Sequence, residues 1–192
     1  MPSDQLAALP VISRRGFLTR SATALLLPIA LHAPRARANS LHVGETAPPA
    51  TLVTLDGQRI STPGLIGKVV ILTFWATWCE PCRAETPHLV KLQQQYSNQG
   101  LQVIGLNVGG EDDRDKVPAY QKEFSIQFPL GFPDDDFADQ FLGDNQNIPQ
   151  SFLFDRNGDL VKRFIGYDET AGAELERLIQ GALTAKPSQT SN

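Results

Sequence analysis

The stretch from Val69 to Tyr96 limits what this chain can fold into more than any other part of it. It opens with an uninterrupted β-branched and aliphatic run, Val69 to Leu72, which is typical of a central strand covered on both faces. Apolar residues then recur at a helical spacing, at Leu89, Leu92 and Tyr96. A second apolar run follows at 103–108 and indicates another strand. The pattern therefore predicts a strand–helix–strand unit.

Two cysteines, Cys79 and Cys82, stand where the first strand gives way to the helix. Free backbone N–H groups and the positive end of the helix dipole favour the thiolate form of Cys79 there. Cys82 is nearly one turn further on, close enough to form a disulfide with Cys79 or to attack a mixed disulfide. A purely structural disulfide is the alternative, but so short a loop gives little stabilisation. The pair is therefore predicted to be redox-active.

Metal and haem sites fit this sequence poorly. Zinc would need two further ligands, and the three histidines, His32, His42 and His88, form no H-x₃₋₅-H pair. Covalent haem needs C-x-x-C-H, and Arg83 occupies the last position. We expect no metal and no cofactor.

The first 38 residues carry the features of an export signal. Paired arginines in Ser13–Leu18 precede an apolar stretch, 22–33, that is shorter than the roughly 20 residues a membrane-spanning helix needs. Ala36-Arg37-Ala38 offers a cleavage site between small residues. The segment resembles a twin-arginine signal peptide, and a general secretory signal is the alternative. Both predict a periplasmic or otherwise extracytoplasmic location.

The charge of the remaining chain narrows the choice of partners. The 192 residues carry a net charge of −4, and loss of residues 1–38 would leave 12 basic and 20 acidic residues, a charge of −8. Such a surface disfavours nucleic acid and anionic membranes. Two acidic runs, Glu111–Asp113 and Asp134–Asp136, are predicted to be solvated loop charges without a role. We expect a monomeric mature chain with no transmembrane segment.

The chain before the central unit predicts a short leader and a hairpin. Residues 39–50, with Pro48-Pro49, are expected to be irregular. Two short strands, Thr51–Leu55 and Gln58–Ser61, flank Asp56-Gly57, which predicts a tight hairpin turn with positive φ at both central residues.

The chain after the central unit predicts two short helices, two strands and a final helix. The short helices are expected at 115–124 and 134–142, and the strands Ser151–Phe154 and Leu160–Ile165 are joined by an Asn-Gly turn that makes them antiparallel. A helical stripe follows, formed by Leu175, Leu178, Ile179, Ala182 and Leu183. Residues 51–184 are thus predicted to form one domain, and 185–192 a polar tail.

The segment Phe74 to Pro87, FWATWCEPCRAETP, resembles the active-site segment of the thioredoxin superfamily, and specifically its TlpA/ResA-like extracytoplasmic branch. The resemblance continues through 103–108, 128–136 and 148–166. It implies an α/β thioredoxin-like fold, βαβ plus ββα around a mixed central sheet, with an added N-terminal β-hairpin. It also implies an exported thiol-disulfide oxidoreductase that reduces disulfide-containing client proteins. The implied electron donor is another dithiol protein, a membrane carrier of the CcdA/DsbD type.

The resemblance assigns roles around the dithiol. Cys79 is the expected nucleophile and the more exposed thiol, while Cys82 faces inward and resolves the mixed disulfide. Trp78 is expected to shield one side of the pair. The two residues between the cysteines, Glu80 and Pro81, are expected to tune the reduction potential.

Glu85 is the expected proton acceptor for Cys82. It lies three residues beyond that thiol, on the same side of the helix. An ordinary solvated glutamate is the alternative from spacing alone. The resemblance implies the catalytic role instead. Ordinary thioredoxins carry a buried aspartate at the position of Thr73, whereas TlpA/ResA-like proteins have a glutamate at the position of Glu85.

Ile148-Pro149 is the expected second half of the site. Base rates favour a trans bond before proline, whereas the resemblance implies a cis bond packed opposite the dithiol. The backbone of Ile148 would then pair with an extended client segment.

Two other functions remain as alternatives. A thioredoxin-fold peroxidase of the peroxiredoxin type would need threonine three residues before its reactive cysteine, where this chain has Ala76. A non-catalytic binding module would be expected to lack one cysteine or Pro149, and this chain keeps all three.

Overall fold

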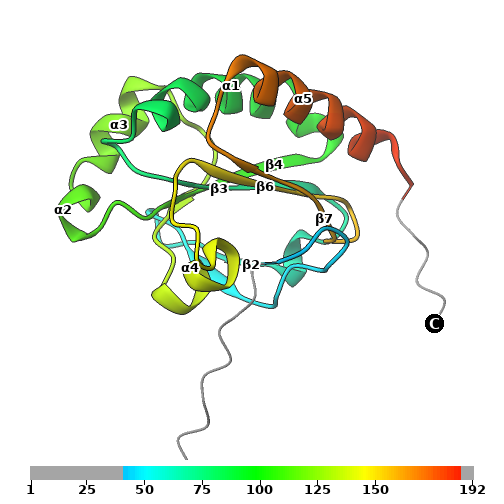
Figure 1. Ribbon diagram of the computed structural model, residues 1–192, viewed down its shortest axis with the longest axis horizontal. Helices are drawn as coiled ribbons and strands as arrows, with labels where there is room; N and C mark the ends of the chain where they lie inside the picture. The colour runs from blue at the N-terminus through cyan, green and yellow to red at the C-terminus, as the bar shows by residue number, and fades with distance from the viewer. Residues whose placement is uncertain (1–40, 187–192) are drawn as a thin grey trace, which may run out of the picture. The chain divides into compact units, whose positions relative to one another are not determined.

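The computed structural model describes residues 41–186, which form one unit around a five-stranded mixed sheet (Figure 1). The predicted signal peptide and most of the predicted polar tail lie outside the described residues. The strands follow the order β5-β4-β3-β6-β7. Their bounds are β3 (Val69–Trp75), β4 (Leu101–Asn107), β5 (Leu130–Gly131), β6 (Gln150–Phe154) and β7 (Leu160–Ile165).

Strand direction divides the sheet into two halves. β3 pairs in parallel with β4, which forms the predicted βαβ unit, and β4 pairs in parallel with β5. On its other side β3 pairs antiparallel with β6, and β6 with β7, which is the predicted ββα half. The thioredoxin-like arrangement is therefore confirmed. The short edge strand β5 was not predicted, because two residues carry no periodicity.

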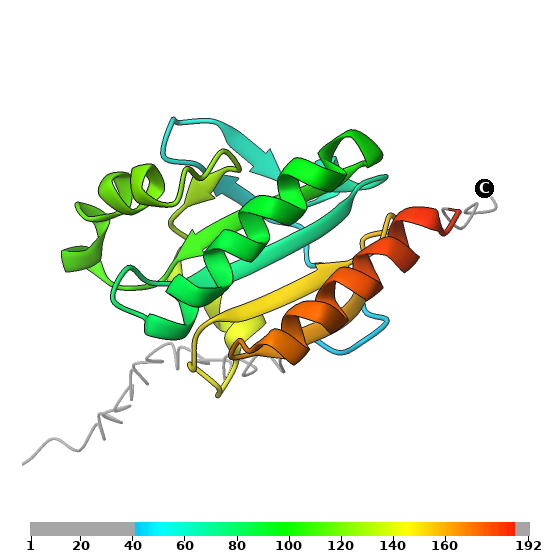
Figure 2. The same ribbon diagram turned by 90° about the horizontal axis from the view of Figure 1, so that it is seen from above.

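β3 is buried along its whole length, as its apolar run predicted. Because side chains alternate across a strand, it supplies both hydrophobic cores. One core includes Val69 and Ile71 and is closed by α1 (Glu80–Tyr96), α3 (Val117–Glu123) and α5 (Glu169–Thr184). The other includes Leu72 and Phe74 and is closed by α4 (Asp135–Leu142) and Leu52 of the hairpin. Figure 2 shows α1 and α5 lying side by side over the sheet.

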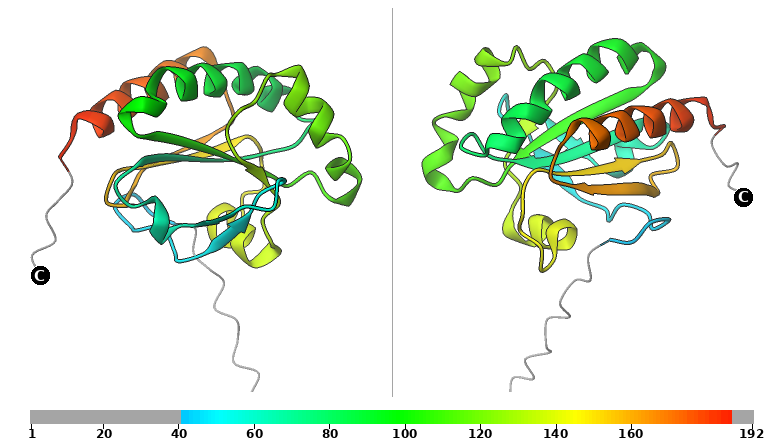
Figure 3. Two further views of the ribbon diagram at one scale, coloured as in Figure 1. Left: turned by 180° about the vertical axis from the view of Figure 1, so that it is seen from behind. Right: turned by 45° about the horizontal axis from the view of Figure 1, so that its top comes forward.

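The predicted N-terminal hairpin is present as β1 (Thr51–Val53) and β2 (Arg59–Ser61), which pair antiparallel on the side of the sheet that α4 covers (Figure 3). The predicted turn was wrong in detail, because only Gly57 has a positive φ, of 79°. Gly57 N–H donates to Thr54 O at 2.9 Å, and Thr54 N–H donates to Gln58 O at 2.9 Å. The loop therefore has three residues, and only its last one needs the left-handed conformation.

The hairpin also covers the open edge of β5. The Leu55 N–H donates to Leu130 O at 2.8 Å, and Thr54 bridges Gly131. A Cβ on Gly131 would lie 2.7 Å from the carbonyl oxygen of Val53, so this close approach requires glycine.

The two acidic runs are exposed as predicted at every position except Asp113, but they lie at helix starts rather than in loops. Asp134 caps α4, since its carboxylate accepts the Phe137 N–H at 2.8 Å. Glu111–Arg114 forms a short helix, α2, which was not predicted. Within it Asp113 is only 1% exposed. The prediction of a solvated charge is therefore wrong only for Asp113, whose carboxylate is held inside the protein by hydrogen bonds.

Short 3₁₀ turns complete the chain at Pro63–Leu65 and Ser97–Gln99. The predicted helices at 115–124, 134–142 and the C-terminus correspond to α3, α4 and α5. Residues 41–50 are irregular, as expected, and lie against the end of the sheet, where Ala47 N–H donates to Gly158 O at 2.9 Å. No helix within residues 41–186 is long and apolar enough to cross a bilayer.

Candidate active site

Cys79 lies at the junction of β3 and α1, where it is the N-cap residue of the helix. It forms a disulfide with Cys82, with an S–S distance of 2.07 Å. The Cys79 Sγ also accepts the backbone N–H of Cys82 at 3.3 Å. This N–H is one of the donors that a helix start leaves without an intrahelical partner, and it would stabilise a thiolate on Cys79 after reduction. In the disulfide form both residues are buried, Cys79 being 4% and Cys82 1% exposed.

Glu85 lies within the protein, only 3% exposed. Its carboxylate accepts hydrogen bonds from two hydroxyls of the sheet, Ser151 Oγ at 2.7 Å and Thr73 Oγ1 at 3.2 Å. Burial raises the pKa of Glu85 to about 7, although both hydrogen bonds act to lower it. Glu85 is therefore not an ordinary solvated glutamate, and it exchanges its proton near neutral pH.

The segment before β6 lies against the disulfide. The Ile148–Pro149 peptide bond is cis, as the family resemblance implied. The Ile148 carbonyl oxygen lies 3.6 Å from Cys79 Sγ. A backbone hydrogen bond fixes Pro149, because its carbonyl oxygen accepts the Gly166 N–H at 2.8 Å.

The remaining predicted residues lie on the outer side of the dithiol. Trp78 is 63% exposed, and its indole N–H points to Gly109 O at 3.5 Å. Glu80 and Pro81 form the first turn of α1, and both are exposed. Trp78 thus presents a large apolar surface next to Cys79.

A groove of about 500 Å³ lies between α2 and α4. Its lining includes Gly110 and Gln146, which are close along the chain to Gly109 and Ile148. Arg114 forms part of its wall, stacked over Phe132 at 4.2 Å. No sequence pattern indicated this groove.

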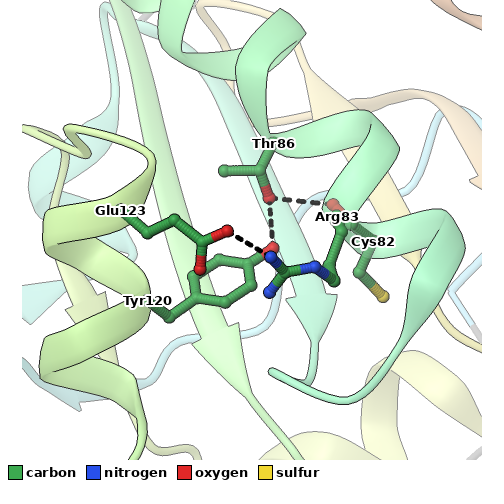
Figure 4. Close-up of polar contacts among 5 residues, drawn as sticks. All are labelled: Cys82, Arg83, Thr86, Tyr120 and Glu123. Carbon is green, nitrogen blue, oxygen red and sulfur yellow. Dashed lines mark hydrogen bonds and ion pairs between the residues drawn. The ribbon is translucent and has the colours of Figure 1, made fainter.

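α3 fixes the first turns of α1 beside the dithiol (Figure 4). The Thr86 hydroxyl donates to Cys82 O at 2.8 Å and lies 2.7 Å from the Tyr120 hydroxyl. Arg83 covers the Tyr120 ring at 5.5 Å and forms an ion pair with Glu123. Burial raises the pKa of Tyr120, so its hydroxyl stays neutral. These contacts hold the backbone around Cys82.

Sequence reasoning missed two groups. Ser151 was read only as part of a strand, although its hydroxyl contacts Glu85. Asp113 was assigned no role, although its carboxylate accepts hydrogen bonds from Thr77 and Asn107. The only available signal for Ser151 was its position two residues after Pro149.

Neither a cluster of metal ligands nor a threonine three residues before Cys79 occurs among residues 41–186. Among residues 41–186 no three His, Cys, Asp or Glu side chains lie together as metal ligands. Ala76 is buried and offers only its carbonyl to the Cys79 N–H, at 3.3 Å. A hydroxyl at that position, which a peroxidatic cysteine requires, is absent from this site.

A thioredoxin-like fold with a C-x-x-C disulfide at its first strand-to-helix junction defines a thiol-disulfide oxidoreductase. The comparisons with known proteins agree. Residues 43–163 match the AhpC/TSA family. The thiol-disulfide oxidoreductase ResA of Bacillus subtilis is 31% identical over 154 residues, covering 79% of this chain and 80% of that protein. ResA of Bacillus cereus is also 31% identical, over 73% of this chain and 78% of that protein.

A solved structure shows the same fold. The thiol:disulfide interchange protein of Chlorobium tepidum, a thioredoxin family protein, superposes with a TM-score of 0.65 and 30% identity over 76% of this chain and 99% of its own. The chain belongs to the AhpC/TSA family and, within the thioredoxin superfamily, to the ResA-like thiol-disulfide oxidoreductases.

Proposed function

We propose that this protein is exported and reduces disulfide bonds of client proteins outside the cytoplasm. The observation that carries the proposal is the buried Glu85, three residues beyond Cys82 on α1. Its pKa of about 7 suits a group that takes a proton from a thiol near neutral pH and later returns it. A structural disulfide would have no need of such a base.

The proposed reaction has two exchange steps. The Cys79 thiolate attacks a client disulfide, so that a Cys79–client S–S bond forms and one client thiolate leaves. Cys82 gives its proton to Glu85 and then attacks Cys79 Sγ, which forms the Cys79–Cys82 bond and releases the second client thiolate. The client gains two electrons and the protein loses two. The Cys79–Cys82 disulfide would be the oxidised product of this reaction.

The client is proposed to bind as an extended segment along Ile148. A backbone hydrogen-bonded to Ile148 would hold its cysteine beside Cys79, since the Ile148 carbonyl is 3.6 Å from Cys79 Sγ. The exposed Trp78 would cover the other side of that segment. Glu80 and Pro81 would set the reduction potential through the helix start.

Export and electron supply follow from the same proposal. Residues 1–38 would be removed as a twin-arginine signal peptide, leaving a leader at 39–50, the domain at 51–184 and a tail at 185–192. The oxidised protein would be reduced again by a dithiol protein in the membrane, of the CcdA/DsbD type. The similarity to thiol-disulfide oxidoreductases of the ResA type supports the exchange chemistry.

The reduction potential tests the direction of transfer. We expect the protein without residues 1–38 to equilibrate with redox buffers near the value of thioredoxin, about −270 mV, rather than near that of the oxidant DsbA, about −120 mV. A value near −120 mV would contradict the role as a reductant and would leave the exchange chemistry intact.

A further inference from the structure

We propose that Asp113 is a positioning residue for the dithiol, which holds the turn before Cys79 in place through Thr77 and Trp78. Asp113 is on α2, 34 residues after Cys79 in the numbering of the chain. The inference rests on the proposed role of Cys79 as the nucleophile, and the experiment below tests the two separately.

The carboxylate of Asp113 joins the start of α1 to the end of β4. One oxygen accepts the Thr77 backbone N–H at 2.9 Å and the Asn107 side-chain N–H at 2.8 Å. The other accepts the Thr77 hydroxyl. Thr77 is two residues before Cys79, so the anchored backbone leads directly into the N-cap of the helix.

Asp113 carries its charge inside the protein. It is 1% exposed, and burial acts to raise its pKa, but the hydrogen bonds from Asn107 and Thr77 together with the charge of Lys116 outweigh burial, and the net shift is downward. The side chain is therefore an anion at neutral pH. A buried carboxylate is strongly destabilised when it loses its hydrogen-bond donors. The bonds that Asp113 accepts therefore restrain the groups that donate them.

The Asp113 carboxylate also fixes the loop at Gly109, which contacts Trp78. A Cβ on Gly109 would lie 2.3 Å from Asp113 Oδ2, so the loop passes directly over the carboxylate and requires glycine. Asn107 Oδ1 accepts the Gly109 N–H at 3.1 Å, and Gly109 O faces the Trp78 indole at 3.5 Å. Asp113 thus binds Thr77 directly, and it supports Trp78 through the loop at Gly109.

Positioning matters here because Cys79 depends on geometry for its reactivity. Its sulfur must lie at the helix start to accept the Cys82 N–H, and beside the Ile148 carbonyl to meet a client. A loosened turn would move the sulfur away from these groups, which lowers the thiolate fraction and the rate of attack.

The test compares two substitutions that remove the same charge from the full-length protein. Asp113→Asn breaks the anchored network, and Asp112→Asn, at an exposed neighbouring position, is the matched control. The rate of iodoacetamide labelling of the reduced protein is measured against pH, and peptide mapping identifies the labelled cysteine. We expect Asp113→Asn to raise the apparent pKa of the Cys79 thiol and to slow labelling at pH 7 by about tenfold, a scale typical of small misplacements. The control should stay within about twofold, since the exposed Asp112 anchors nothing in this turn.

The direction of the pKa change separates positioning from simple electrostatics. Removing a negative charge favours a nearby thiolate, so an unchanged or lowered thiol pKa in Asp113→Asn would overturn the proposal. If that variant does not fold, Thr77→Val and Thr77→Ser decide, because only serine keeps the hydroxyl. Serine should retain the parent pH profile and valine should not, and identical profiles would overturn the proposal. Labelling of Cys82 in place of Cys79 would instead refute the assignment of the nucleophile.

Discussion

Glu85→Gln should stabilise this protein at neutral and alkaline pH while impairing its catalysis. In the folded protein the Glu85 carboxyl has a pKa of about 7, above its ordinary value of 4.5. The folded state therefore binds a proton more tightly than the unfolded state does. Its stabilisation by this proton is fully present below about pH 4.5 and is lost as the pH rises through about 7.

The size of the effect follows from the difference between the two pKa values. Each pH unit corresponds to about 1.4 kcal/mol, so the change from 4.5 to about 7 amounts to a loss on the order of 3 kcal/mol. Glutamine has nearly the same shape and no charge, and its amide can still meet the hydroxyls of Ser151 and Thr73. Its free energy of unfolding should equal that of the parent near pH 4 and exceed it by about 3 kcal/mol at pH 8.

Urea unfolding of the oxidised protein between pH 4 and 8 measures this difference. The matched control is Glu80→Gln, an exposed glutamate in the first turn of the same helix. Its effect should stay below about 1 kcal/mol, as expected for a surface charge at a helix start. If the difference between Glu85→Gln and the parent does not change with pH, the carboxyl titrates normally and the reasoning is refuted.

Three further outcomes are expected. Cys79→Ser should abolish insulin reduction, whereas Cys82→Ser should accumulate mixed disulfides through Cys79, which gels run without reductant would show. If a limiting amount of alkylating reagent labelled Cys82 before Cys79 in the reduced protein, these two roles would be reversed. Replacement of Arg14 and Arg15 by lysine should leave precursor in the cytoplasm on fractionation, and undiminished export would indicate the general secretory route. Phe141→Ala should lower the free energy of unfolding by about 3–5 kcal/mol, because the ring is fully buried among other aromatic rings. Urea unfolding measures this change, and a loss below about 1 kcal/mol would contradict that packing.

The fold could be predicted where periodicity and turn residues agree. β3 was visible because both of its faces are buried, and α5 because one apolar stripe repeats along it. β5 and α2 were missed because two and four residues are too short to repeat a pattern. The hairpin turn was assigned the wrong geometry because Asp-Gly fits two loop lengths, and the pairing of Thr54 with Gln58 selects the longer one.

The dithiol and its spacing could be read directly from the sequence, and the surroundings could not. Whether Glu85 is buried depends on how α1 packs against β3 and β6, and β6 comes much later in the chain than α1. Asp113 stands in an acidic run whose other members are exposed, so composition gives the wrong answer for the one carboxylate that is held inside. Contacts between distant segments decide both cases.

The pKa of Glu85 results from two opposing causes, and the balance between them suits the proposed catalytic role. Burial alone would raise the pKa of the carboxyl above 7, which would leave less of the carboxylate form free to accept a proton from Cys82. The hydroxyls of Thr73 and Ser151 stabilise the anion and bring the pKa back toward 7. A salt bridge to a basic side chain would lower the pKa of Glu85 too far, and the carboxylate would then bind a proton too weakly to serve as a base. Two neutral hydroxyls on neighbouring strands therefore keep the pKa of Glu85 in the range that the proposed catalytic role needs. The same raised pKa lowers the stability of the folded protein at alkaline pH.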